Sequence, residues 1–117
     1  MDLQAITEKI RAFRDERDWV QFHNPKDMAI ALSIEASELL EHFLWKNPEE
    51  VAQRVVSKRD EIEEEIADIA IYLVELADNL DIDLLNAMEK KLRRNAEKYP
   101  AERVKGSSLK YNEYGAE

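Results

Sequence analysis

The sequence contains no cysteine, so neither a disulfide framework nor a thiolate nucleophile is available to it. Glycine occurs only at positions 106 and 115, and the three prolines are widely separated. Turns are therefore scarce, which favours a few long helices over many short strands. No signal peptide and no apolar run of membrane length is visible, so a soluble cytoplasmic protein without a membrane partner is expected.

Positive charge is also in short supply. The 117 residues include 17 Lys and Arg against 26 Asp and Glu, which gives a net charge of −9. This balance disfavours nucleic-acid polymers as partners, because phosphate backbones are held by Lys and Arg. Acidic residues dominate between positions 35 and 83, and basic residues dominate between positions 90 and 110. One half of the chain is therefore suited to a metal ion and the other to an anion.

The stretch from Asp60 to Leu80 predicts a long helix, because its apolar residues recur at alternating steps of four and three. Glu65, Asp68 and Tyr72 project from one flank of this apolar stripe. A second predicted helix carries Glu35 and Glu38 at the same offsets from its own stripe. The stripes expected to form the core are Ile62, Ile66, Ile69, Leu73, Leu76 and Leu80 in the first helix, and Met28, Leu32, Ala36, Leu39 and Phe43 in the second.

If these two helices pack with their stripes together, four carboxylates converge at one partly buried place: Glu35, Glu38, Glu65 and Asp68. Buried like charges raise one another's pKa and repel, and a divalent ion with oxygen ligands relieves both effects. Mg²⁺ is therefore the expected ion. The alternative, a merely solvated acidic face, stays open because E-x-x-E pairs are common on acidic chains. His42 lies four residues after Glu38, so the Glu-x-x-His spacing of di-iron bundles is missing. A redox iron site is therefore disfavoured.

Aromatic rings cluster in a short connection just before the second helix. The Asn-Pro pair at 24–25 marks the start of that helix, with Asn as the N-cap and Pro in the first turn. The rings either plug the core or stack on a ligand, and the same two interpretations apply to Trp45, two turns beyond Glu38. The clustered rings are those of Trp19, Phe22 and His23.

The whole pattern predicts an all-α fold, a helical bundle of four to five helices. Polar residues after Pro100 indicate an extended or partly disordered tail, 101–117, which leaves 1–100 as the helical domain. The expected helices span residues 2–18, 25–46, 48–57 and 60–80, and a last one runs from Asp81 or Asp83 to Pro100.

Five segments together resemble the MazG family of all-α nucleoside triphosphate pyrophosphohydrolases, and most of all its branch of small dCTP pyrophosphatases. These segments are ERDWVQFHNP, IEASELLEHFLWK, EEIADIAIYLVELA, KLRRNAEKYP and SSLKY, and they span nearly the whole chain. The resemblance implies a nucleoside triphosphate substrate, Mg²⁺ as cofactor with Mn²⁺ as a substitute, and a homodimer or homotetramer in which neighbouring subunits complete the sites.

The resemblance also implies roles for individual residues. The Mg²⁺ ligands would be Glu35, Glu38, Glu65 and Asp68. The base and sugar pocket would be formed by Trp19, Phe22, His23, Trp45 and Tyr72, and the phosphates would be contacted by Lys91, Asn95, Lys98 and Tyr99. On spacing alone, Lys91, Asn95 and Lys98 share one helix face, which is more usually a solvated face.

The chemistry expected is attack of water on the α-phosphorus, which releases pyrophosphate and leaves a nucleoside monophosphate. One of the four carboxylates orients or deprotonates the water, with Glu38 as the first candidate and Glu35 as the second. Gln21, His23 and Asn95 are candidates for hydrogen bonds to the base. Two alternatives stay open: a related enzyme for a dUTP-type or phosphoribosyl-ATP-type nucleotide, and a non-enzymatic helical interaction module.

Overall fold

The structure is a computed structural model that describes residues 1–108, and this part of the chain contains helices and no strand. The predicted all-α fold is confirmed. The chain divides into two compact units, Met1–Ile82 and a second that begins at Asp83. In order, the elements are α1 (Leu3–Glu16), the 3₁₀ turn η1 (Val20–Phe22), α2 (Pro25–Glu41), α3 (Pro48–Ser57), α4 (Arg59–Asn79), α5 (Leu84–Lys98) and α6 (Ala101–Val104).

Side-chain caps fix where the helices begin. The predicted start of α2 is confirmed, because the Asn24 side chain accepts a hydrogen bond of 2.9 Å from the Asp27 N–H and Pro25 is the first helical residue. Asn47 starts α3 with a reciprocal capping box. Asp83 rather than Asp81 caps α5.

The end of α2 differs from the prediction, because the helix stops at Glu41 rather than near position 46. The N–H groups of His42 and Phe43 bond three residues back, to Leu39 and Leu40, which tightens the last turn and ends the α-helical pattern. The His42 ring is held by Arg54 of α3, with 3.1 Å from Arg54 Nη2 to His42 Nδ1. The chain therefore turns early to bring α3 back beside this end of α2.

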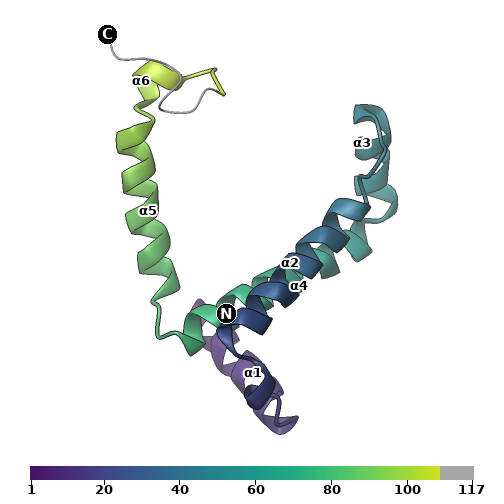
Figure 1. Ribbon diagram of the computed structural model, residues 1–117. Helices are drawn as coiled ribbons and strands as arrows, with labels where there is room; N and C mark the ends of the chain where they lie inside the picture. The colour runs from purple at the N-terminus through teal and green to yellow at the C-terminus, as the bar shows by residue number, and fades with distance from the viewer. Residues whose placement is uncertain (109–117) are drawn as a thin grey trace. The chain divides into compact units, whose positions relative to one another are not determined.

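Helices α2 and α4 lie side by side (Figure 1) and form the principal contact of the first unit. Along each helix a row of buried or half-buried residues recurs at steps of three and four, and these two rows are termed the α2–α4 seam. Two of the predicted acids, Glu35 and Glu65, belong to this seam, whereas the sequence placed them beside the core. Its members are Met28, Leu32, Glu35 and Leu39 on α2 with His42 as the C-cap, and Ile62, Glu65, Ile69, Tyr72, Leu76 and Asn79 on α4.

Half of the predicted α4 core stripe was therefore wrong. Ile66, Leu73 and Leu80 are 53%, 42% and 46% exposed. Ala36 of α2 is exposed as well. The buried and half-buried residues of α4 include Glu65 and Ile69, so the neighbouring apolar residues Ile66 and Leu73 are left exposed.

Helix α1 packs on the C-terminal end of α4 (Figure 1). Arg11 forms an ion pair with Asp78, and Arg14 Nη1 donates to Asn79 Oδ1 at 2.8 Å. Ile10, on the same helix, is buried, with 7% of its surface exposed. These contacts tie the N-terminal helix to the end of the seam that lies away from the acids.

Helix α6, Ala101–Val104, lies within the segment expected to be an extended tail. Residues 109–117, which include the end of the SSLKY segment, lie outside the described residues. The division into a domain of residues 1–100 and a tail therefore stays a prediction. No helix in residues 1–108 combines the length and apolarity that a membrane span requires.

Candidate functional site

Three of the four predicted acids meet across the α2–α4 seam. Glu35 and Glu38 come from consecutive turns of α2, and Glu65 comes from α4. One carboxylate oxygen from each lies within 4.8 Å of the others. This group is termed the acid cluster below, and its three oxygens are close enough to share one divalent ion.

Two oxygens of the acid cluster are buried without a hydrogen-bond partner, namely Glu35 Oε2 and Glu65 Oε2. Buried polar atoms are normally paired, because an unpaired one loses its hydration without compensation. A hard divalent cation such as Mg²⁺ would supply the missing partner for both. The residues present therefore fit a metal ion of this class.

The electrostatics of the cluster lead to the same conclusion. Burial, followed by the hydrogen bond and charge of Glu38, raises the pKa of Glu35 to about 7. Burial and Glu38 also raise the pKa of Glu65. A bound cation would oppose both shifts, because it favours the charged form of a carboxyl group.

Asp68, the fourth predicted ligand, is exposed and lies outside the acid cluster. It remains within electrostatic reach, because its charge contributes to the raised pKa values of both Glu35 and Glu65. Tyr72 follows one turn later and is half-buried. Burial, together with the charges of Glu35, Asp68 and Glu75, raises its pKa.

A pocket of about 500 Å³ opens beside the acid cluster. Glu38 and Glu65 form part of its wall, and Arg54 supplies its positive charge. Because Arg54 can only donate hydrogen bonds, it fixes Nδ1 of His42 as an acceptor. The pocket is lined by Glu38, Glu41, His42, Arg54, Glu61, Glu64 and Glu65.

The aromatic residues lie on a short connection before α2, as predicted, and this connection contains the 3₁₀ turn Val20–Phe22. Trp19 is 42% exposed and makes an edge contact with Phe13, at 5.8 Å between ring centroids. Phe22 is more exposed, at 62%. Gln21 donates to the backbone and side chain of Asp18. The rings are thus available to a ligand, and their role in nucleotide binding stays a prediction.

His23 is the one member of this connection that reaches a buried partner on α4. Its Nδ1 lies 2.5 Å from Oε2 of Glu75, a residue that is only 4% exposed. Glu75 was missed by sequence reasoning, as were its neighbours Asn79 and Arg14. The available signal was its position three residues after Tyr72, on the same side of α4.

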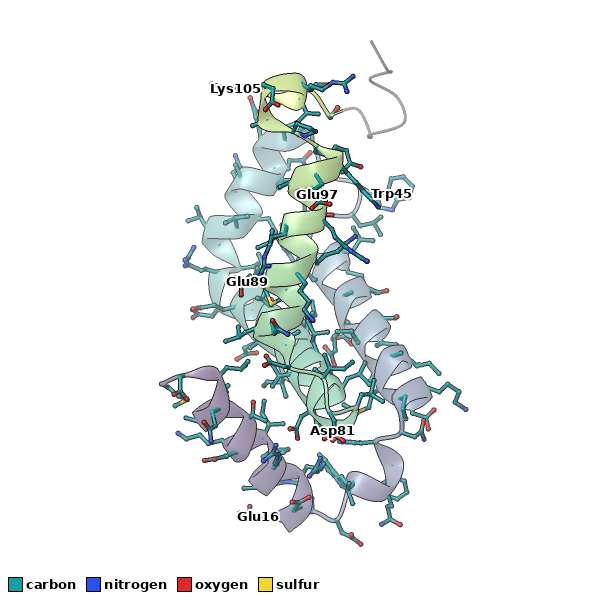
Figure 2. All side chains as sticks on the ribbon, turned by 90° about the vertical axis from the view of Figure 1, so that its left-hand side faces the viewer. Glu16, Trp45, Asp81, Glu89, Glu97 and Lys105 are labelled. Carbon is teal, nitrogen blue, oxygen red and sulfur yellow. The ribbon has the colours of Figure 1, made fainter. Side chains whose placement is uncertain are left out.

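Trp45 lies on the connection between α2 and α3, where its indole projects away from the ribbon (Figure 2). The side chain is 92% exposed, and the backbone adopts a left-handed φ of 61°. It does not line the pocket beside the acid cluster. Its assignment to the base and sugar pocket stays a prediction.

The predicted phosphate ligands belong to the second unit. Lys91, Asn95 and Lys98 are on α5, and Tyr99 is its C-cap. Lys91 and Asn95 share the wall of a pocket of about 360 Å³ with three apolar residues of the same helix. Their role toward phosphate is an open prediction.

Comparisons with known proteins agree with this architecture. The chain is 42% identical to the dCTP pyrophosphatases 1 of Bos taurus and Homo sapiens over 113 residues, which cover 95% of this chain and 67% and 66% of those proteins. It therefore spans about two thirds of their length. A crystal structure of a pyrophosphatase from Archaeoglobus fulgidus has the same fold, with a TM-score of 0.80 and 40% identity over 83% of this chain and 91% of that one.

The sequence pattern of the MazG-like family matches residues 30–114, a range that contains every member of the acid cluster. The resemblance inferred from the five segments is thus confirmed. The family match and the identity to the relatives over nearly the full chain establish that this chain belongs to the MazG-like family.

Proposed function

We propose that this chain is a Mg²⁺-dependent nucleotide pyrophosphohydrolase that converts nucleoside triphosphates, with dCTP as the candidate substrate, to the monophosphate and pyrophosphate. The predicted enzyme class is confirmed by the family, by the relatives named dCTP pyrophosphatase 1 and by the similar crystal structure of a pyrophosphatase. The observation that carries the proposal is the acid cluster, in which three carboxylates converge and two buried oxygens lack a partner.

Glu35, Glu38 and Glu65 would hold the metal ion, with Asp68 as a further ligand one turn along α4. Mg²⁺ suits an all-carboxylate site, and Mn²⁺ is the expected substitute because it accepts the same oxygen ligands. When bound, such an ion neutralises charge on the triphosphate and stabilises the charge that develops during phosphoryl transfer.

The carboxylates of the chain would handle the proton of the attacking water. Glu38 is the exposed member of the acid cluster and borders the pocket of about 500 Å³, so its carboxylate can orient a water molecule there. Glu35 is the second candidate, because it lies one turn before Glu38 on α2 and belongs to the same acid cluster. As the water oxygen bonds to the α-phosphorus, the bond to the bridging oxygen breaks and pyrophosphate leaves with the electron pair.

The remaining predicted residues would bind the rest of the nucleotide. The exposed rings of Trp19 and Phe22 offer stacking surfaces for a base, which provide affinity with little base selectivity. Gln21, Tyr72 and Trp45 would complete the base and sugar pocket. The phosphates would be bound by Lys91, Asn95, Lys98 and Tyr99 of the second unit.

We also propose that the chain works as a homodimer or homotetramer. In residues 1–108 only Ile10, Met28 and Ala77 are buried apolar residues, which is a small core for a chain of this size. Extensive apolar exposure on helices normally marks an interface. The exposed residues are Ile30, Ile34, Leu40 and Leu44 on or just after α2, Ile66, Ile71, Leu73 and Leu80 on or just after α4, and Leu85, Met88 and Leu92 on α5.

A nucleotide panel with identification of the products tests the proposed reaction. With Mg²⁺, dCTP should give dCMP and pyrophosphate. Release of orthophosphate and dCDP would contradict attack at the α-phosphorus. A stronger reaction with dUTP or with phosphoribosyl-ATP would keep the enzyme class and replace the substrate.

Substitutions in the site separate the hydrolase from a helical interaction module. Glu38→Gln should lower kcat by about a hundredfold or more, the usual contribution of a general base, while the helical circular dichroism signal is retained. Glu63→Gln is the matched control, because Glu63 is an exposed residue of α4 outside the acid cluster. Equal activity of the two variants would remove Glu38 from the mechanism and favour the interaction module.

A further inference from the structure

A series of polar side chains crosses the inside of the first unit, outside the acid cluster. Arg14 of α1 donates from Nη1 to Asn79 Oδ1 at 2.8 Å, and Asn79 Nδ2 lies 3.4 Å from Glu75 Oε2. The same Glu75 oxygen is 2.5 Å from His23 Nδ1. Arg14 and Glu75 are both buried, at 9% and 4% exposure. Buried charged groups of this kind require defined partners.

The direction of each hydrogen bond in this series follows from its first member. A guanidinium can only donate, so Asn79 must turn its Oδ1 toward Arg14 and its Nδ2 toward Glu75. A carboxylate can only accept, so Glu75 Oε2 accepts from this amide and from the histidine ring alike. The ring atom of His23 that meets this oxygen must therefore carry a proton. Nδ1 is the donor, and in the neutral ring Nε2 is left as the acceptor on the opposite side.

This histidine lies beside a ring that the proposed function assigns to the base. Its ring neighbours that of Trp19, at 6.2 Å between centroids, and its side chain is 19% exposed. On α4, Tyr72 separates Glu75 from Asp68, and the charges of both acids act on its hydroxyl. At 1.5 Å of helical rise per residue, Glu75 lies about 10 Å along α4 from Asp68 and about 15 Å from Glu65 of the acid cluster. A nucleotide with its phosphates at the acid cluster can extend its base toward His23 over such a length.

We propose that Glu75 is a positioning residue that fixes His23 with Nδ1 protonated, so that Nε2 accepts a hydrogen bond from the exocyclic amino group of the base. The inference rests on the proposed nucleotide site and adds to it a reason for selecting cytosine, whose N4 amino group is a donor where uracil has the O4 acceptor. Glu75 does not touch the nucleotide in this arrangement. It acts through the ring of His23.

The protonation of His23 can be measured in the wild-type protein without any substitution. Nitrogen-15 NMR of the imidazole rings distinguishes a protonated Nδ1 from a bare one. The chain has two histidines, and His42 provides an internal control because its Nδ1 accepts from Arg54. We expect Nδ1 to be protonated in His23 and bare in His42. A bare Nδ1 in His23 would overturn the proposal.

Two substitutions of Glu75 test its effect on binding. Glu75→Met keeps the volume but removes the acceptor, and we expect the KM for dCTP to rise about tenfold, the loss of one good hydrogen bond, with kcat little changed. Glu75→Gln keeps an oxygen at the same place and should restore most of the affinity. In a His23→Ala background, Glu75→Met should have no further effect on KM, because the two residues act as one unit.

Base selectivity and a matched control distinguish positioning from simple structural support. Glu75→Met should lower the preference for dCTP over dUTP, whereas Asp78→Asn, which removes a carboxylate from the same helix, should change neither KM nor this preference. A Glu75→Met enzyme with unchanged KM and preference would overturn the inference and leave the proposed hydrolase intact. If the wild type hydrolyses no nucleotide, the proposed function fails, and the NMR measurement with dCTP titration still decides the role of Glu75.

Discussion

The metal-free protein should lose stability as the pH rises from about 5 to about 8, because Glu35 keeps a proton in the folded state that it releases when unfolded. Burial and the neighbouring Glu38 raise its pKa from 4.5 to about 7. Between these two values the folded chain binds more protons than the unfolded chain, so the free energy of unfolding falls with increasing pH. The loss of stability is absent below the unfolded-state pKa of 4.5 and complete above the folded-state pKa of about 7.

The size of this effect follows from the shift in proton affinity. At about 1.4 kcal/mol for each tenfold change, a rise from 4.5 to about 7 corresponds to roughly 3 kcal/mol. Glu35 has one fully buried oxygen, but its side chain as a whole is only half-buried. Solvent screening reduces the contribution, and we expect about 1 to 2 kcal/mol. For a chain of this length, that lowers the melting temperature by about 4 to 10 °C.

Thermal melting followed by circular dichroism, at fixed protein concentration and with a chelator present, measures the effect. Glu35→Gln should flatten the dependence on pH, whereas the exposed control Glu63→Gln should retain it. Mg²⁺ should raise the melting temperature of the wild type most strongly at the alkaline end, where the acid cluster is fully charged. Parallel curves for wild type and Glu35→Gln, or no response to Mg²⁺ at high pH, would refute the reasoning.

Two further predictions concern the packing of the first unit. Met28→Ala should lower the free energy of unfolding by about 2 to 4 kcal/mol, because Met28 is 1% exposed and truncation leaves a cavity in the seam; a urea titration showing almost no change would contradict this. The Arg11 guanidinium lowers the pKa of Asp78 below 3.8, so this ion pair stabilises the fold above that value and is lost as the pH falls. Asp78→Asn should therefore reduce the loss of folding stability on acidification. Acid titrations of variant and wild type that superimpose would exclude the effect.

Helix boundaries set by local chemistry could be predicted from the sequence. Asn24 and Pro25 specify the start of α2, and Asn47 with Glu50 specifies that of α3, because each cap involves residues within one turn. The end of α2 could not be predicted in this way. It depends on the contact between His42 and Arg54, twelve positions apart, which no local signal encodes.

The sequence also predicted three of the acids that meet, with Asp68 as the fourth that stays outside the cluster, but it did not predict how deeply they lie. Apolar residues recur at helical spacing on two sides of α4. Periodicity alone does not say which of these sides packs against α2 and which one stays exposed. Glu65 was therefore placed beside the core although it lies in the α2–α4 seam, and Ile66 was placed in the core although it is 53% exposed. Glu75 was missed because its position three residues after Tyr72 is a weak signal on an acidic helix, and its partner His23 lies 52 positions away in the sequence.

The two tryptophans give the molecule a built-in optical probe. Trp45 is 92% exposed and Trp19 is 42% exposed, so the emission of the isolated chain is that of largely hydrated indole. A left-handed backbone at Trp45 holds this ring outward at a conformational cost of roughly 1 kcal/mol, which a glycine would avoid. Any event that covers the ring, whether a nucleotide or a second subunit, will shift its fluorescence to shorter wavelength and register without an added label.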